Sequence, residues 1–283
     1  MIKLGLVGRA ISQSSSPDLH KLLGDLYGYE LDYQLHEPDN ESPAALQATL
    51  AELVRSGYRG CNVTYPYKQA ALKLADKIKP SAALVGSTNT LLFGESIIAA
   101  NTDYSGFIRG YRARFAEEPA GKVLLIGAGG VGRAIAFGLF EVGATEVFIS
   151  DLDVNSAHSL AEAINAKGFK ASVADKEKIA DIARDVDGLV NCTPVGHYKS
   201  PGIPLDKELF GGQQWAFDAV YTPLDTEFLI EANRHGLRLM SGFDLFIYQG
   251  IDAFEIFVGA QVDAGKALAS FQKKYGLQSE LLR

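Results

Sequence analysis

Short apolar segments alternate along this chain with longer stretches in which apolar residues recur every three or four positions. The first pattern is typical of buried strands and occurs at residues 3–8, 31–36 and 60–64. The second is typical of amphipathic helices and occurs at residues 17–26 and 44–56. Strands that alternate with helices in this way form parallel sheets covered by helices, so the beginning of the chain predicts an open α/β domain.

The same alternation continues to the end of the chain, with one break at residues 117–121. Before the break we expect a helix at 67–78, strands at 90–93 and 96–100, and a helix at 104–115. After it we expect strands at 122–127, 146–150, 170–173, 188–192, 214–220 and 237–240, and helices at 132–142, 155–166, 178–184, 226–235, 243–258 and 263–275. The last helix is expected to return to the first domain.

Acidic residues outnumber basic ones by 34 to 27, which gives the 283-residue chain a formal net charge of −7. The resulting field repels nucleic acids and anionic membranes, so we expect neither as a partner. No apolar run is long enough to cross a bilayer, and the first residues are too short and too soon charged for a signal peptide, which predicts a cytoplasmic protein. Cys61 and Cys192 are far apart and predict neither a disulfide framework nor a metal site.

The clearest motif lies between an expected strand and an expected helix and consists of Gly127, Ala128, Gly129, Gly130, Val131 and Gly132. In a dinucleotide-binding turn the first glycine permits the tight turn, the second lets the backbone approach a pyrophosphate, and the third lets the helix lie close to the strand. The N-terminus of the helix then offers free N–H groups to the phosphates. The alternative interpretation is a tight strand–helix turn without a ligand.

Asp151 follows the next expected strand, where an acid can accept hydrogen bonds from the adenine ribose and repel a 2′-phosphate. No Lys or Arg occurs between Arg133 and Lys167, although an NADP site needs a cation near the 2′-phosphate. These two features favour NAD over NADP, unless a distant cation such as Arg184 folds into the site. Asp151 could otherwise be a simple capping residue.

Ser14, Ser16 and Pro17 mark the beginning of a helix, with Ser16 at the N-cap and Pro17 at the first helical position. Capping alone would explain these residues. They could also hold a carboxylate through two hydroxyls and the helix N-terminus, and a net-negative protein that binds an anion needs such a local site.

Lys68 stands in a second segment of this kind, two residues after Pro66, which again fits a first helical position. A cation in the first turn opposes the helix dipole, and a residue that breaks a local rule often has a function. The dipole would favour the neutral amine that a general base needs. A surface lysine remains an equally good interpretation of this segment alone.

Asn89 and Asp103 lie in two polar clusters at the ends of expected strands, where ligands bind in open α/β sheets. Asn89 could equally satisfy backbone groups of a turn, and Asp103 could cap the helix that follows.

Taken together, the motifs resemble those of the shikimate/quinate dehydrogenase family, in family order from residue 8 to about residue 255. The matching segments are Ser14-x-Ser16-Pro17, Asn62-Val-Thr64-x-Pro66-x-Lys68, Gly86-x-x-Asn89-Thr90, Asn101-Thr102-Asp103-x-x-Gly106, Gly127 to Ala134, Val190 to Pro194, Asp218-x-x-Tyr221 and Gly242 to Gln249. The resemblance implies a substrate domain of residues 1–104 and 244–283, a Rossmann-like coenzyme domain of residues 105–243, and an active site between them.

The resemblance also implies a role for each matched residue in hydride transfer between a ring hydroxyl of shikimate or quinate and NAD. Lys68 and Asp103 would form the catalytic pair. Ser14, Ser16 and Tyr221 would hold the substrate carboxylate, and its hydroxyls would bind Thr64, Asn89, Asp103 and Gln249. The coenzyme would contact the glycine turn, Asp151, Thr193, Val220 and Gly242, in a monomer or a homodimer.

Three departures from the family pattern refine this prediction. Members that use NADP carry an Asn-Arg-Thr-like stretch where this chain has Ser-Asp-Leu-Asp at residues 150–153, so the chain resembles the branch that prefers NAD and often accepts quinate. Ala219 and His197 each replace a common Met near the nicotinamide, and His197 could be a catalytic base or a loop histidine. The choice between shikimate, quinate and an amino-substituted relative stays open.

Two other functions compete with this one. A ligand-sensing module of the same fold would do no redox chemistry, but it would be expected to lose the Lys/Asp pair or the glycine turn. Another two-domain dehydrogenase with a catalytic lysine, such as methylene-tetrahydrofolate dehydrogenase, would not need the Ser-x-Ser helix start.

Overall fold

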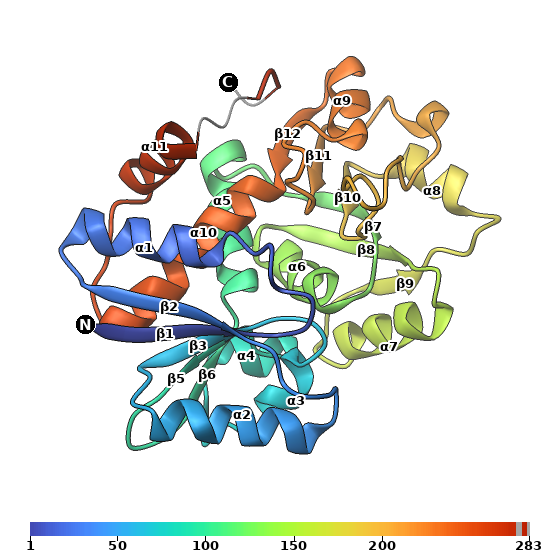
Figure 1. Ribbon diagram of the computed structural model, residues 1–283. Coiled ribbons are helices and arrows are strands. Elements are labelled where there is room, and N and C mark those ends of the chain that lie inside the picture. Colours follow the sequence, from blue (N-terminus) through green and yellow to red (C-terminus); the bar gives the residue numbers. More distant parts are fainter. Residues whose placement is uncertain (276–278, 282–283) are drawn as a thin grey trace. The chain divides into compact units, whose positions relative to one another are not determined.

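The computed structural model describes residues 1–275 and 279–281, and these form a mixed α/β structure with two six-stranded sheets (Figure 1). By its internal contacts the chain divides into two units. Unit 1 contains Met1–Gly106 and residues 247–275, and unit 2 contains Phe107–Phe246 and residues 279–281. Both divisions fall inside a helix, namely α5 (Thr102–Phe115) and α10 (Gly242–Val258).

The sheet of unit 1 has the order β2-β1-β3-β5-β6-β4. Its strands are β1 (Ile2–Val7), β2 (Leu31–His36), β3 (Gly60–Val63), β4 (Lys77–Ile78), β5 (Thr90–Leu92) and β6 (Ile98–Ala100). β1 pairs in parallel with β2 and β3, as predicted, but β5 runs antiparallel to both β3 and β6. The expectation of an all-parallel sheet is therefore wrong here, because the short connection between β5 and β6 can only join antiparallel neighbours.

Helices cover both faces of this sheet. One face packs against side chains of α2 (Pro43–Arg55), α3 (Lys68–Leu72) and α4 (Pro80–Val85). On the other face Leu4 and Leu6 of β1 pack against Ala253 and Phe257 of α10. α1 (Ser16–Tyr27) contacts β2 and also α11 (Ala264–Tyr275), and the Tyr27 hydroxyl donates to the Asp263 carbonyl at 2.9 Å. The last helix thus packs on the first part of the chain.

The helix expected at residues 67–78 is much shorter in the structure. α3 ends at Leu72, and Lys77–Ile78 forms strand β4 beside β6. The backbone N–H groups of Asp76 and Lys77 both donate to the Ile97 carbonyl, and the Asp76 carboxylate accepts from the Ile97 N–H at 2.7 Å. Pairing with a strand 20 residues away therefore replaces the local helical pattern.

Unit 2 contains a fully parallel sheet with the order β12-β11-β10-β7-β8-β9. The strands are β7 (Gly121–Ile126), β8 (Ala144–Ser150), β9 (Ala171–Val173), β10 (Gly188–Asn191), β11 (Trp215–Asp218) and β12 (Arg238–Ser241). The connecting helices are α6 (Gly130–Glu141), α7 (Val154–Asn165), α8 (Ile179–Asp185), the 3-10 helix η1 (Lys207–Leu209) and α9 (Glu227–Arg234). The strand order changes direction at β7, so the loops after β7 and β10 diverge at the carboxyl ends of the strands, where open α/β sheets bind ligands.

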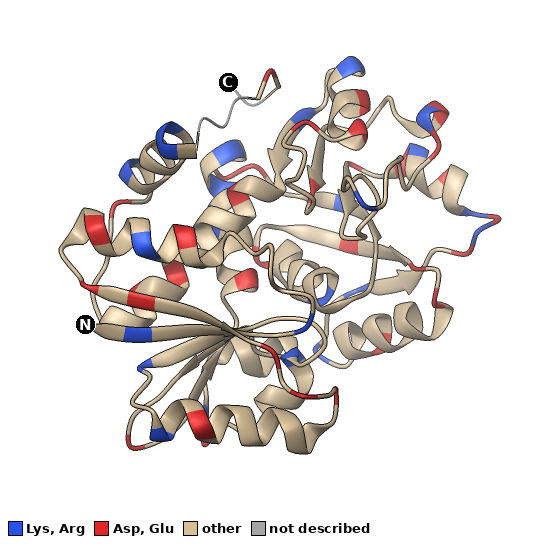
Figure 2. Ribbon diagram, viewed as in Figure 1, with Lys and Arg blue, Asp and Glu red and all other residues tan. Residues whose placement is uncertain are grey.

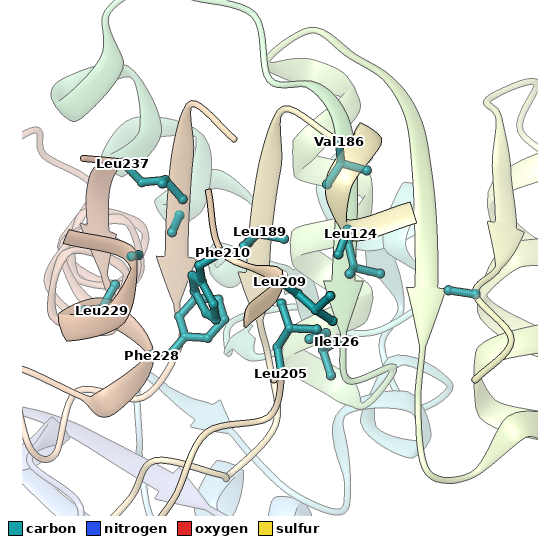
Figure 3. Close-up of a cluster of buried hydrophobic side chains, with 14 residues drawn as sticks. Leu124, Ile126, Val186, Leu189, Leu205, Leu209, Phe210, Phe228, Leu229 and Leu237 are labelled. Carbon is teal, nitrogen blue, oxygen red and sulfur yellow. The ribbon is translucent and has the colours of Figure 1, made fainter. Parts of the chain in front are cut away.

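A cluster of buried apolar side chains holds α8, η1 and α9 against one face of this sheet (Figure 3). Leu124 and Leu189 come from the strands, and Phe228 and Leu229 come from α9. Phe210 and Phe228 meet edge to face with ring centroids 5.3 Å apart. This packing holds the strands through one face of the sheet. The loops that follow the strands lie at their carboxyl ends.

Candidate active site

Lys68 and Asp103 come from distant parts of the sequence and are in direct contact. Lys68 Nζ lies 2.6 Å from Asp103 Oδ2, and the two side chains are only 11 % and 9 % exposed. Separating two charges that are this well shielded from water would leave each one uncompensated, which costs free energy. The ion pair therefore keeps both side chains in position.

The segment before Lys68 differs from the sequence prediction. Pro66 lies in a turn that follows β3, and Lys68 itself is the first residue of α3, which has only five residues. A helix this short has a weak dipole, so the carboxylate of Asp103 is the main charge near the amine, in place of the helix end that we expected.

Asn89 fixes the beginning of the helix that carries Asp103. Its Oδ1 accepts from the Thr102 backbone N–H at 2.7 Å, and its Nδ2 donates to the Thr102 hydroxyl at 3.0 Å. Asn62 donates in turn to the Asn89 carbonyl at 3.2 Å and to the Thr90 hydroxyl at 3.1 Å. All these residues are buried and hydrogen-bonded, so they hold the first turn of α5, which carries Asp103, in a fixed position.

The two serines predicted to bind a carboxylate lie side by side. Ser14 Oγ and Ser16 Oγ are 3.2 Å apart, and the Ser16 N–H donates to Ser14 Oγ at 3.3 Å. The N-cap residue of α1 is Ser15, and Ser16 is the first helical residue, so the predicted capping register is wrong by one position. Burial raises the pKa of Tyr33 of β2, and a hydrogen bond with the side chain of Ser16 acts against this effect.

Two residues that the sequence reasoning missed connect these serines to the asparagines. The hydroxyl of Tyr33 donates to Asn62 Oδ1 at 2.9 Å, and its ring stacks on His20 at a centroid distance of 4.7 Å. Complete burial lowers the pKa of His20 to about 3, against the opposing effect of its hydrogen bond with Asn62, so the imidazole is neutral. Both residues occupy ordinary core positions of a helix and a strand, so nothing in the local pattern distinguishes them.

Thr64 and Gln249 complete the predicted residues of unit 1. Thr64 follows β3, and its N–H donates to the Val7 carbonyl at 2.9 Å. Gln249 lies on α10 at a point where α5 comes very close. A Cβ atom at Gly106 of α5 would lie only 2.5 Å from the Gln249 backbone nitrogen. Only glycine permits this approach, and it places Gln249 beside α5, whose second residue is Asp103.

In unit 2 the glycine turn joins β7 to α6, as predicted. A Cβ at Gly132 would lie 1.9 Å from the Gly127 carbonyl oxygen, so helix and strand meet too closely for any side chain. A Cβ at Gly129, the N-cap of α6, would by contrast meet no atom within 4 Å. The turn is a backbone cradle with open space before the helix N-terminus, and this shape fits a pyrophosphate.

Asp151 lies directly beside this turn. Its Oδ2 accepts from the Ala128 N–H at 2.6 Å and its Oδ1 from the Asp153 N–H at 2.8 Å. The helix that follows, α7, carries an acidic residue but no Lys or Arg (Figure 2). Arg184, the distant cation considered above, lies on α8 and pairs with Asp181 at 3.4 Å.

Of the remaining predicted residues, Thr193 and Val220 lie on the loops after β10 and β11, and Gly242 is the first residue of α10, directly after β12. The Thr193 N–H and hydroxyl both donate to Asn191 Oδ1, at 2.9 and 2.7 Å, and the Val220 N–H donates to Asp218 Oδ1 at 2.9 Å. A Cβ at Gly242 would lie 2.2 Å from the Ala219 carbonyl oxygen. The beginning of α10 therefore contacts the loop after β11 at the carboxyl edge of the sheet.

Tyr221 and His197 lie in the same loops. The ring of Tyr221 stacks on Phe246 with centroids 5.0 Å apart. His197 Nδ1 accepts from the Lys199 N–H at 3.0 Å within a tight loop.

Sequence reasoning also gave no role to Asp218, although it stands in a matched motif. Its side chain is completely buried, and burial raises its pKa to about 7, against hydrogen bonds from Thr226, Val220 and Asn191 that favour the charged form.

Within residues 1–275 and 279–281, no three His, Cys, Asp or Glu side chains are grouped so as to hold a metal ion. No helix of this described part is long and apolar enough to cross a membrane.

Comparisons with known proteins place these motifs in a family. Residues 6–91 match the model of the shikimate dehydrogenase substrate binding domain. The quinate/shikimate dehydrogenase (NAD(+)) of Corynebacterium efficiens is 35% identical over 95% of this chain and 97% of its own length. The chain belongs to the shikimate/quinate dehydrogenase family.

Solved structures agree with this assignment. Quinate dehydrogenase from Corynebacterium glutamicum in complex with NAD has a TM-score of 0.88 and 32% identity, and the match covers 96% of this chain and 99% of that one. Shikimate 5-dehydrogenase from Thermus thermophilus in complex with NADP(H) and shikimate has a TM-score of 0.83 and 33% identity, with the same coverage of both chains. The predictions of a two-domain α/β fold with a Rossmann-like domain, and of a dehydrogenase of the shikimate/quinate dehydrogenase family, are confirmed.

Proposed function

We propose that this member of the shikimate/quinate dehydrogenase family oxidises a ring hydroxyl of shikimate or quinate to the ketone, with NAD preferred over NADP. Residues 1–104 and 244–283 bind the acid, and residues 105–243 bind the coenzyme. The contact of 2.6 Å between Lys68 Nζ and Asp103 Oδ2 carries the proposal, because it provides a positioned acid/base group in unit 1.

Lys68 acts on the proton of the reacting hydroxyl. In the oxidation direction its neutral amine takes that proton at Nζ, and in the reduction direction the ammonium returns it to the developing alkoxide. Asp103 orients Nζ and stabilises the charge that forms there, so the proton belongs to the pair rather than to one residue. When bound, the nicotinamide coenzyme supplies the redox chemistry.

The substrate carboxylate is held by neutral groups in a protein whose net charge of −7 repels an anion. The adjacent hydroxyls of Ser14 and Ser16 bind the carboxylate, together with Tyr221 of unit 2. Thr64, Asn89, Asp103 and Gln249 bind the ring hydroxyls.

The glycine turn, residues 127–132, would hold the pyrophosphate of the coenzyme, and Thr193, Val220 and Gly242 would lie near its nicotinamide end. Asp151 accepts hydrogen bonds from the adenine ribose, and its charge disfavours a 2′-phosphate. Support for NAD comes from the place of this carboxylate beside the Ala128 N–H and from the lack of Lys or Arg in residues 134–166.

Steady-state kinetics with shikimate and quinate, each with NAD+ and NADP+, test this function. We expect NADH formation with at least one acid, and a kcat/KM for NAD+ that exceeds the value for NADP+. Turnover that is faster with NADP+ would refute the coenzyme assignment, and no turnover with either acid would refute the substrate.

A further inference from the structure

Asp218 is the last residue of β11, and its side chain is 0 % exposed. Its neighbour across the parallel pairing is Asn191, the last residue of β10, which is also 0 % exposed. A carboxyl group without access to water is costly unless donors surround it, so its hydrogen bonds indicate what it does.

The two oxygens of this carboxylate have different partners. Oδ1 accepts from Asn191 Nδ2 at 2.9 Å and from the Val220 N–H at 2.9 Å. Oδ2 accepts from the hydroxyl of Thr226, the N-cap residue of α9, at 2.6 Å. Oδ1 is therefore the atom that joins the loop after β10 to the loop after β11.

Asn191 extends this junction into the first loop. Its Nδ2 also donates to the Val195 carbonyl at 3.0 Å, while its Oδ1 accepts from the N–H and the hydroxyl of Thr193. The same loop contacts the glycine turn, because a Cβ at Gly127 would lie 2.7 Å from the Cys192 carbonyl carbon. A continuous path of contacts thus connects Asp218 to the turn proposed to bind the pyrophosphate.

We propose that Asp218 is a positioning residue. Through Oδ1 it holds the loops that carry Thr193 and Val220 in their coenzyme-binding arrangement even when no coenzyme is bound. This inference rests on the proposed function, since it assumes that the two loops face the nicotinamide end. Asp218 itself does not touch the coenzyme.

Calorimetric titration with NAD+ tests this role independently of turnover. Asp218→Ala removes the acceptor shared by Asn191 and Val220, and it weakens NAD+ binding about tenfold, the size expected for a lost buried hydrogen-bond acceptor. Asp218→Asn keeps an oxygen at the Oδ1 position and lets the Thr226 hydroxyl turn to accept from the new amide, so it binds NAD+ within about threefold of the wild type.

Gln213→Ala is the matched control in the same unit. Gln213 is also buried and makes three hydrogen bonds, to the Ala183 and Leu209 carbonyls and from the Gly211 N–H, but it precedes β11 at the opposite edge of the sheet. This variant loses stability without a loss of NAD+ affinity. Equal NAD+ affinity in Asp218→Ala and the wild type, or equal weakening in Asp218→Ala and Gln213→Ala, would overturn the proposal, and so would weakening in Asp218→Asn as large as in Asp218→Ala.

Amide hydrogen exchange in the wild-type protein gives a second test that needs no variant to fold. The Val220 N–H should exchange slowly in the absence of NAD+, because it is already bonded to Asp218. Fast exchange that becomes slow only after NAD+ is added would overturn the proposal. A wild-type protein that binds no NAD+ but protects Val220 would instead refute the proposed function and leave the junction intact.

Discussion

Each unit of this enzyme contains a buried polar cluster. The two clusters differ in whether their buried carboxyl group has a charged partner. In unit 1 the buried groups around Asn62, such as His20, are neutral, and the buried carboxylate of Asp103 is paired with the charge of Lys68. In unit 2 a carboxyl group, Asp218, lies completely inside with only neutral partners. This difference is consistent with the proposed proton transfer in unit 1 and with the proposed positioning of loops in unit 2.

The strongest test of this contrast is the removal of the amine in unit 1. Lys68→Ala should lower kcat by roughly 10²–10⁴-fold, the usual contribution of a general acid or base, with little change in NAD+ affinity. Kinetics and calorimetry measure both quantities. Lys73→Ala, which removes an exposed lysine at the end of the same helix, should leave kcat unchanged. A kcat near the wild-type value in Lys68→Ala would contradict the assigned role.

The neutral histidine of unit 1 should make the protein sensitive to acid. Its pKa is about 3 in the folded state but near 6.5 in an unfolded chain, so the unfolded state binds the proton first as the pH falls. The free energy of unfolding should therefore decrease from about pH 6.5 to about pH 3, by up to about 4 kcal/mol from this residue. His20→Gln should flatten this slope in urea denaturation, whereas exposed His158→Gln should not. An unchanged slope in His20→Gln would count against a neutral His20.

The carboxyl of unit 2 should give the opposite slope. Its pKa is about 7 in the folded state and near 3.9 in an unfolded chain, so the folded state keeps the proton longer as the pH rises. The stabilisation from Asp218 is complete below about pH 4 and is lost toward pH 7, by a few kcal/mol at most. Asp218→Asn should remove this loss, and exposed Asp206→Asn should not. If His20 and Asp218 both made the free energy of unfolding rise with pH, or both made it fall, the contrast between the units would be wrong.

The smallest expected effect concerns the choice of coenzyme. Asp151→Asn keeps one oxygen to accept from the Ala128 N–H, but it loses the acceptor of the Asp153 N–H and removes the charge that disfavours a 2′-phosphate. The ratio of kcat/KM for NAD+ to kcat/KM for NADP+ should fall roughly tenfold, as expected when a like-charge contact is relieved. Asp175→Asn removes an exposed acid elsewhere in unit 2 and should leave the ratio unchanged. A ratio unaffected by Asp151→Asn would assign NAD preference to other residues.

The sequence by itself determined the features that short segments encode. Alternating strands and helices, the glycine turn between β7 and α6, and the acid after β8 all follow from local periodicity and turn chemistry, so they were predictable. The matched motifs also identified Lys68 and Asp103 as partners before any distance was known, because the resemblance to the family carried that information.

Only the tertiary structure decided how the strands of unit 1 pair and which polar groups support the site. Residues 77–78 join a sheet against their helical pattern, because the Ile97 carbonyl accepts from the N–H groups of Asp76 and Lys77 and β6 pairs with both strand residues. His20 and Tyr33 occupy positions that any apolar residue could fill, and their link to Asn62 exists only after a helix and two strands have packed together. Hydrogen bonds between residues far apart in the chain depend on three-dimensional position, which local periodicity does not contain.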